Sequence, residues 1–123
     1  MYKDWLIISE GSGPVVATAI HDGHALRPDV SELITLSESQ RLREEDPFTA
    51  SWASIFDVRL IPTRSRFEVD LNRPREKAVY IKARDAWGLN LWHTQPAEQM
   101  LAESFTLYDQ FYSELHRILA KIE

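Results

Sequence analysis

An amphipathic helix in the last quarter of the chain constrains the fold more than any other feature. After Pro96, large apolar and aromatic residues recur at alternating steps of four and three. These positions are Leu101, Phe105, Tyr108, Tyr112, Leu115, Leu119 and Ile122. The spacing places all seven on one stripe of a long helix, and such a stripe needs a sheet to pack against. Because the helix continues to Glu123 with no strand after it, we expect a domain that is incomplete at its C-terminus.

The rest of the chain predicts short strands and helices. Predicted strands cover residues 5–9, 14–20, 58–62, 66–71 and 78–81, and the first two form a hairpin around a glycine turn. Predicted helices cover residues 28–42 and 49–56, while residues 85–94 form a loop. Ser37, with Gln40 three residues later, is typical of a capping box, which divides the first helical range into two short helices. We therefore expect an α/β fold in which helices flank a mixed sheet.

Composition limits the classes of protein to consider. The 123 residues, 44% of them hydrophobic, are enough for one globular domain over residues 1–123. The absence of cysteine excludes disulfides and thiolate metal sites, and a net charge of −5 argues against nucleic-acid binding. No apolar stretch approaches the roughly 20 residues of a membrane helix, and no signal peptide is present, so we expect a cytoplasmic protein with no membrane partner.

Two histidines follow the second predicted strand. His21 and His24 lie three residues apart, with Gly23 between them. A histidine at the carboxyl end of a strand lies at the sheet edge where open α/β folds bind ligands. Neutral imidazole is the commonest protein ligand of metals, so both residues are candidate zinc ligands. The alternative is a pair of solvated loop histidines.

A run of carboxylates follows the first helical range. Glu44, Glu45 and Asp46 stand together before Pro47. Three carboxylates usually mark a solvated helix end, but carboxylates at a helix C-terminus oppose the helix dipole. A divalent cation would offset that repulsion. Glu45 and Asp46 are therefore candidate partners of the histidines on a metal.

A third group of candidates surrounds the end of the strand predicted at residues 66–71. Pro74 favours an extended conformation at Arg73, so that this guanidinium is directed off the strand end. Arg73 and the Asn72 amide together suit a carboxylate ligand, and Arg66 could hold a second acid group. The alternative is a surface ion-pair network, in which Arg66 pairs with Asp70 or Glu68.

In order along the chain, these motifs resemble the N-formylglutamate amidohydrolase family. The similar parts are His-x-Gly at residues 21–23, Glu-Asp-Pro-Phe-Thr at 45–49, Ser-Arg-Phe-x-Val-Asp-Leu-Asn-Arg-Pro at 65–74 and Trp-Gly-Leu at 87–89, followed by Leu-Trp at 91–92. The resemblance runs from about Val15 to the end of the chain. Asp-Leu-Asn-Arg-Pro is its most specific part.

The resemblance implies a zinc enzyme. The family is related to zinc carboxypeptidases and aspartoacylases, which share an Asn-Arg pair that binds a substrate carboxylate. By this resemblance Asn72 and Arg73 bind that carboxylate, His21 is the first zinc ligand, and Glu45 or Asp46 is the second. His24 stands where the carboxypeptidases carry a glutamate ligand. The implied fold is hydrolase-like, of the zinc-exopeptidase type, and the implied reaction is zinc-dependent hydrolysis of a small N-formyl amino acid.

One departure from the family pattern affects the expected activity. Family members have a further metal histidine on a strand after the long helix, and the acid/base residue is expected beyond it. The sequence ends at Glu123, before either position. The resemblance therefore implies the N-terminal part of an amidohydrolase, with no catalytic acid/base residue assigned, and we expect this chain alone to be inactive. The alternatives are a related acylase or carboxypeptidase acting on another acyl amino acid or a short peptide, and a non-catalytic domain that binds a partner through an apolar face.

Overall fold

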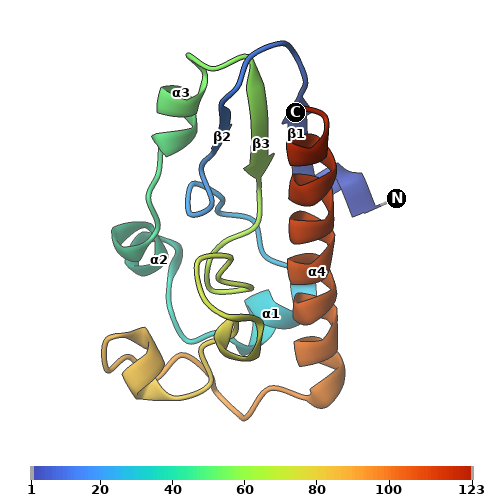
Figure 1. Ribbon diagram of the computed structural model, residues 1–123. Helices are drawn as coiled ribbons and strands as arrows, with labels where there is room; N and C mark the ends of the chain where they lie inside the picture. The colour runs from blue at the N-terminus through green and yellow to red at the C-terminus, as the bar shows by residue number, and fades with distance from the viewer. Residues whose placement is uncertain (1, 123) are drawn as a thin grey trace.

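A small mixed sheet forms one end of the molecule in the computed structural model, which describes residues 2–122 (Figure 1). The strand order is β1-β3-β2, with β1 at Leu6–Ser9, β2 at Val16–Thr18 and β3 at Val58–Pro62. The central strand β3 pairs antiparallel with β1 and parallel with β2. A parallel pair needs a long crossover, and the three helices between β2 and β3 provide it. The prediction of an α/β fold with a mixed sheet and helices is confirmed.

The crossover helices follow the sequence signals closely. They are α1 at Pro28–Leu33, α2 at Glu38–Glu44 and α3 at Thr49–Ala53. Ser37 caps α2 as predicted: its hydroxyl accepts from the Gln40 backbone N–H, and the Gln40 side chain accepts from the Ser37 backbone N–H. The chain also contains short 3₁₀ turns at Tyr2–Trp5, Arg75–Lys77 and Ala83–Ala86, which we label η1, η2 and η3.

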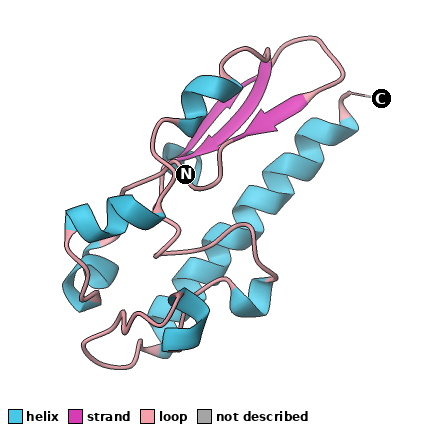
Figure 2. Ribbon diagram, turned by 90° about the vertical axis from the view of Figure 1, so that its left-hand side faces the viewer, coloured by secondary structure: helices cyan, strands magenta, loops and turns pink. Residues whose placement is uncertain are grey.

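The long helix α4, at Glu98–Ala120, runs along the whole molecule (Figures 1 and 2). Near its C-terminal end, Phe111 and Ile118 pack with Leu6, Val58 and Leu60 of the sheet. Near its N-terminal end it contributes to a second buried cluster below the sheet. That cluster consists of Val30, Ile34, Phe67, Val79, Tyr80, Ala86, Leu91, Trp92 and Met100. One helix thus contacts both buried clusters, while α3 covers the opposite face of the sheet.

The predicted stripe of α4 is displaced from the most buried line of the helix. The helix residues that are most buried are Met100, Ser104, Phe111, Glu114 and Ile118. Most of the predicted positions are only partly buried, and Leu119 is 45% exposed. The most buried positions lie one residue before the predicted ones, and two of them carry polar side chains that a search for hydrophobic residues passes over. Ser104 bonds to Arg27 and Glu114 to Arg117, so hydrophobicity alone did not reveal the centre of the face.

Three strand predictions are wrong. Strands β1 and β2 do not form a hairpin, because β3 inserts between them. Residues 66–71 and 78–81 form buried loops and turns. The alternation of residues 66–71 suggested one solvated face, but Glu68 and Asp70 are only 1% exposed, like their apolar neighbours Phe67, Val69 and Leu71. Both sets of side chains point into protein, so the segment is a buried connection and not the edge of a sheet.

Among residues 2–122, none of the helices combines the length and the apolar character that a membrane-spanning helix needs.

Candidate functional site

The candidate site lies where the parallel strands β2 and β3 end. The segment after β2 runs beside the segment after β3, and the two are joined by backbone hydrogen bonds from Ala25 to Thr63 and from Ser65 to Ala25. Gly23 allows this approach, because a Cβ atom there would lie 2.4 Å from the Arg64 carbonyl oxygen. The sequence placed His21 at the carboxyl edge of a sheet, and the structure puts it there.

His21 is buried between two carboxylates. Its Nε2 lies 2.7 Å from Oδ1 of Asp70, and its Nδ1 lies 3.5 Å from Oδ2 of Asp46. The backbone brings Asp46 close, since its N–H donates to the His21 carbonyl at 2.8 Å. Because an ionised carboxylate only accepts hydrogen bonds, Nε2 is the donor to Asp70, while Nδ1 faces Asp46.

Asp70 joins the two halves of the site. Its Oδ1 also accepts from the Asn72 backbone N–H at 2.9 Å, and its Oδ2 accepts from the Tyr80 hydroxyl and from Nη2 of Arg66 at 3.3 Å. Burial opposes ionisation of this carboxyl group, but the hydrogen bonds from His21 and Tyr80 outweigh it, so that the pKa of Asp70 lies well below its usual value. Asp70 is therefore a buried anion at neutral pH.

The second predicted histidine pairs with the second predicted carboxylate. Nδ1 of His24 lies 2.5 Å from Oε1 of Glu45. The other oxygen of Glu45 accepts from Arg41 at 2.9 Å and from the Ser65 hydroxyl. Glu45 is 3% exposed and Arg41 is 6% exposed, so this ion pair is internal. The four predicted metal ligands thus occur as two separate pairs, one of His21 with Asp46 and one of His24 with Glu45.

The arrangement can be tested against the needs of zinc. Within residues 2–122, no three histidine and carboxylate side chains gather closely enough to hold a metal ion. The His21–Asp46 pair nevertheless has a suitable spacing, because two ligands of a tetrahedral zinc with bonds of about 2.1 Å lie roughly 3.4 Å apart. The contact of Asp70 with the other nitrogen of His21 is the type that orients metal-binding histidines. His21 and Asp46 therefore fit as two ligands.

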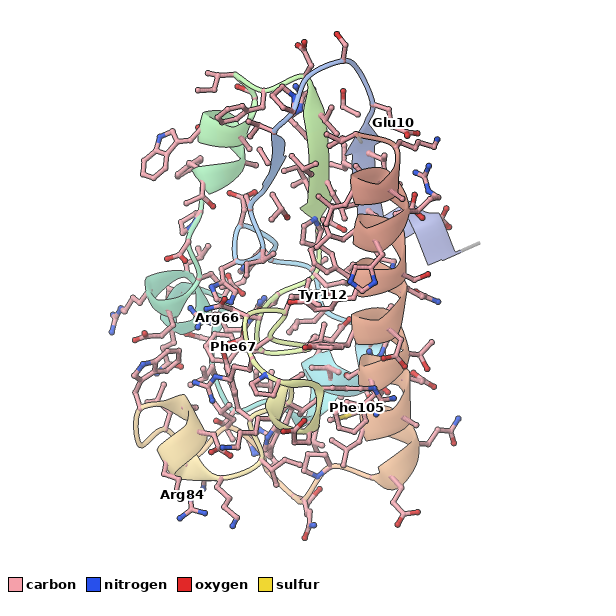
Figure 3. The ribbon with its side chains drawn as sticks, viewed as in Figure 1. Glu10, Arg66, Phe67, Arg84, Phe105 and Tyr112 are labelled. Carbon is pink, nitrogen blue, oxygen red and sulfur yellow. The ribbon has the colours of Figure 1, made fainter. Side chains whose placement is uncertain are left out.

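The predicted substrate residues Arg66 and Arg73 differ in how many of their guanidinium N–H groups already donate hydrogen bonds within the protein. Arg66, labelled in Figure 3, donates to the Tyr80 hydroxyl, the Glu44 carbonyl and Asp70, so three of its five N–H groups have partners. Its i,i+4 ion pair with Asp70 is the local pairing that the sequence offered as an alternative. Arg73 is different: Nε lies 3.5 Å from Asp70, and no hydrogen bond from its guanidinium is found within residues 2–122.

Comparison with known proteins decides the family. The sequence model of the N-formylglutamate amidohydrolases matches residues 13–123, which is most of the chain. The chain belongs to the N-formylglutamate amidohydrolase family. No curated protein and no solved structure matches it.

In this N-formylglutamate amidohydrolase homologue, sequence reasoning missed two residues of the candidate site. The sequence suggested Asp70 only as a possible ion-pair partner of Arg66, and it suggested no function for Tyr80. Asp70 begins the Asp-Leu-Asn-Arg-Pro motif, so the motif itself contained the signal for it. Tyr80 lies in a predicted strand that did not form, and nothing in the sequence pattern marked its hydroxyl. Burial raises the pKa of Tyr80, as does the charge of Asp70, so the hydroxyl stays protonated as a donor.

A shallow hollow opens beside the histidines of this family member. It measures about 450 Å³ and is lined by Asp22, His24, Leu42, Pro47, Phe48, Ala50 and Ser51. Oδ1 of Asp22 is buried and has no hydrogen-bond partner among the described residues. The hollow adjoins the His24–Glu45 pair, and its volume is in the range of small-molecule sites.

Proposed function

We propose that this chain carries the metal-binding and substrate-binding residues for hydrolysis of a small N-acyl amino acid, with N-formylglutamate as the expected substrate. Membership of the amidohydrolase family supports the reaction class. One structural observation supports the site: His21 and Arg73 both lie against the same buried carboxylate, Asp70. The residue expected to bind metal and the residue expected to bind substrate are therefore close neighbours.

The substrate carboxylate is assigned to Arg73 and Asn72. The Arg73 side chain is 29% exposed, and its guanidinium carries a planar set of donors without internal hydrogen bonds among the described residues. Such a fork matches a carboxylate with two parallel hydrogen bonds. Asn72 is exposed next to it and can add an amide donor. Arg66, on the buried side of the site, has two N–H groups without a partner among the described residues, and we assign these to a second acid group of the substrate.

Zinc is the proposed cofactor, held by His21 and Asp46, with His24 and Glu45 as the remaining predicted ligands. When bound, zinc supplies Lewis acidity and brings the pKa of a water molecule to about 7. Asp70 holds the His21 ring in the tautomer that leaves Nδ1 free on the side of Asp46. Arg73 fixes one end of the substrate, so that the amide bond takes a defined position relative to His21.

The direct test compares Arg73→Lys with the wild type, each as the full-length protein, in hydrolysis of N-formylglutamate. Lysine keeps the charge but loses the planar fork, so we expect kcat/KM to fall by about 10- to 100-fold, the effect of one or two charge-assisted hydrogen bonds. Arg84→Lys is the matched control, because Arg84 is exposed at the end of the molecule opposite the sheet (Figure 3). Undiminished turnover by Arg73→Lys would show that the clamp is misassigned.

A substrate panel separates glutamate specificity from a broader acylase or peptidase activity. N-formylglutamate has a side-chain carboxylate that N-formylleucine lacks. If Arg66 holds this second acid group, N-formylleucine should be hydrolysed at least tenfold more slowly, because a partly buried guanidinium is left unpaired. Equal rates for the two substrates, or faster cleavage of a dipeptide, would favour the broader activity.

Partner binding without catalysis is the second candidate function, and a surface feature favours it. Three large apolar side chains are mostly exposed at and beside α3: Phe48 is 81% exposed, Trp52 75% and Ile55 79%. Exposed apolar side chains that gather in one place are typical of interaction surfaces. Absence of hydrolysis together with self-association that Trp52→Ser abolishes, measured by light scattering, would favour this function over the enzyme.

A further inference from the structure

Tyr80 contacts three charged side chains of the site, those of Asp70, Arg66 and Arg73. Tyr80 belongs to the segment that connects η2 to η3, and its side chain is fully buried. The hydroxyl donates to Oδ2 of Asp70 and accepts from Nε of Arg66 at 2.9 Å. The guanidinium of Arg73 lies over the face of the same ring, with Cζ 4.4 Å from the ring centroid. One tyrosine therefore touches the anion and both cations.

Three donors converge on a single oxygen of Asp70. The Tyr80 hydroxyl is the closest to Oδ2, Nη2 of Arg66 lies at 3.3 Å, and Nε of Arg73 lies at 3.5 Å. A distance of 3.5 Å is beyond an ordinary N–H···O hydrogen bond. The Tyr80 hydroxyl is therefore bonded to the same oxygen that Arg73 approaches without forming a hydrogen bond.

This geometry has a consequence for the donors of Arg73. An arginine next to a buried carboxylate ordinarily closes on it with two parallel hydrogen bonds, which would use up its fork. Here the guanidinium stays on the aromatic ring, where a cation–π contact holds its plane without using any N–H group. Its terminal nitrogens remain available to a ligand.

We propose that Tyr80 is a positioning residue for substrate recognition: its hydroxyl keeps Asp70 from closing on Arg73, and its ring holds the Arg73 guanidinium open toward a carboxylate ligand. The inference rests on the proposed function for the identity of that ligand. It assigns to Tyr80 a role in substrate affinity and none in the chemical step.

The test is Tyr80→Phe in the full chain, which removes the hydroxyl and keeps the ring. Asp70 then loses its closest donor and accepts from Arg73, so the substrate carboxylate must displace an internal partner. We expect KM for N-formylglutamate to rise at least about tenfold, as for one lost charge-assisted hydrogen bond, while kcat changes less than about threefold. Thr106→Val is the control for loss of a hydroxyl, because the Thr106 hydroxyl donates to the Ala102 carbonyl within α4, outside the site.

A double-mutant cycle with Arg73→Lys separates positioning from general loss of structure. If Tyr80 acts through Arg73, the effect of Tyr80→Phe should largely vanish in the Arg73→Lys background. Additive effects, a fall in kcat at constant KM, or an equal rise in KM for Thr106→Val would overturn the inference.

Calorimetric titration with N-acetylglutamate distinguishes failure of this inference from failure of the proposed function. If the wild-type protein does not hydrolyse N-formylglutamate but binds this probe, the proposed reaction is wrong, and the inference is judged on affinity alone. Weaker binding by Tyr80→Phe would then support it, and equal binding would overturn it. No binding by the wild-type protein would overturn both.

Discussion

Gly23 lies at the closest approach of two backbone segments. A Cβ atom there would lie 2.4 Å from the Arg64 carbonyl oxygen and 2.5 Å from the Thr63 carbonyl carbon. Backbone cannot move aside as the end of a flexible side chain can. We therefore expect Gly23→Ala to lower the free energy of unfolding by more than about 2 kcal/mol, measured by urea denaturation.

The neighbouring Asp22→Ala is the control for Gly23→Ala. One oxygen of Asp22 is buried with no hydrogen-bond partner in the described part of the chain, so its removal should change stability by less than about 1 kcal/mol. If Gly23→Ala unfolded at the same urea concentration as the wild-type protein, the two segments could not be as close as described.

Tyr80 predicts a loss of stability at alkaline pH. Its folded-state pKa is raised, first by burial and then by Asp70. A raised pKa means that this contribution to stability is complete below the unfolded-state pKa of about 10 and is lost as pH rises above it. Between pH 9 and 11, the free energy of unfolding should therefore fall more steeply for the wild-type protein than for Tyr80→Phe. Parallel pH profiles would contradict this expectation.

At the scale of single residues, the sequence predicted positions better than contacts. His21 and Asp46 lie together, and Arg73 lies near them, as expected from motifs that end strands and helices. The contact that joins them runs through Asp70, which is 49 residues from His21. No helical or strand spacing relates residues so far apart, so the role of Asp70 appeared only in three dimensions.

At the scale of elements, α4 and the cap of α2 were predicted because their signals are local. The helix period and the Ser37–Gln40 pair need only neighbouring residues. The segment at residues 66–71 was misassigned because a period of two also occurs when polar side chains are buried on the second face. Asp70 and Glu68 are inside because they have ionic partners there, His21 and Arg66 for the one and Arg27 for the other.

Two substitutions distinguish the buried face of α4 in the structure from the hydrophobic stripe predicted from the sequence. Phe111 is 1% exposed, whereas Leu119, a member of the predicted stripe, is 45% exposed. Phe111→Ala should lower the free energy of unfolding by about 3–5 kcal/mol, and Leu119→Ala by less than about 1 kcal/mol. Equal losses in thermal or urea unfolding would mean that the helix faces the sheet along the stripe read from sequence.

At the scale of the whole molecule, the strand order was the least predictable feature. A glycine-containing turn after β1 suggested that β1 and β2 pair directly, since short connections favour hairpins. Instead β3, which follows about 40 residues later, lies between them and pairs with both. Strand choice of this kind depends on the packing of α3 and α4 on the two faces of the finished sheet, which no short stretch of sequence encodes.

Zinc should stabilise the folded molecule if His21 and Asp46 bind it. A ligand that binds only the folded state at 100 times its dissociation constant adds about 2.7 kcal/mol of stability, so the melting temperature should rise with zinc concentration and fall again with a chelator. Asp46→Asn should weaken this response, and because the Asp46 side chain is 56% exposed the variant should still fold. His116→Ala, at an exposed position on α4, is the control. Equal responses in the two variants would exclude Asp46 as a ligand.

The segment that contains Asn72 and Arg73 is not a β-strand of the sheet. Two tyrosine hydroxyls on α4 hold it in place. The Tyr108 hydroxyl donates to the Arg73 carbonyl at 2.8 Å. Tyr112, one turn later and labelled in Figure 3, donates to the Leu71 carbonyl. A single-residue deletion in α4 ahead of Tyr108 would turn both side chains by about 100° around the helix axis. The motif would lose both anchors at once, so its shape is tied to the rotational phase of a helix that contributes no side chain to the proposed chemistry.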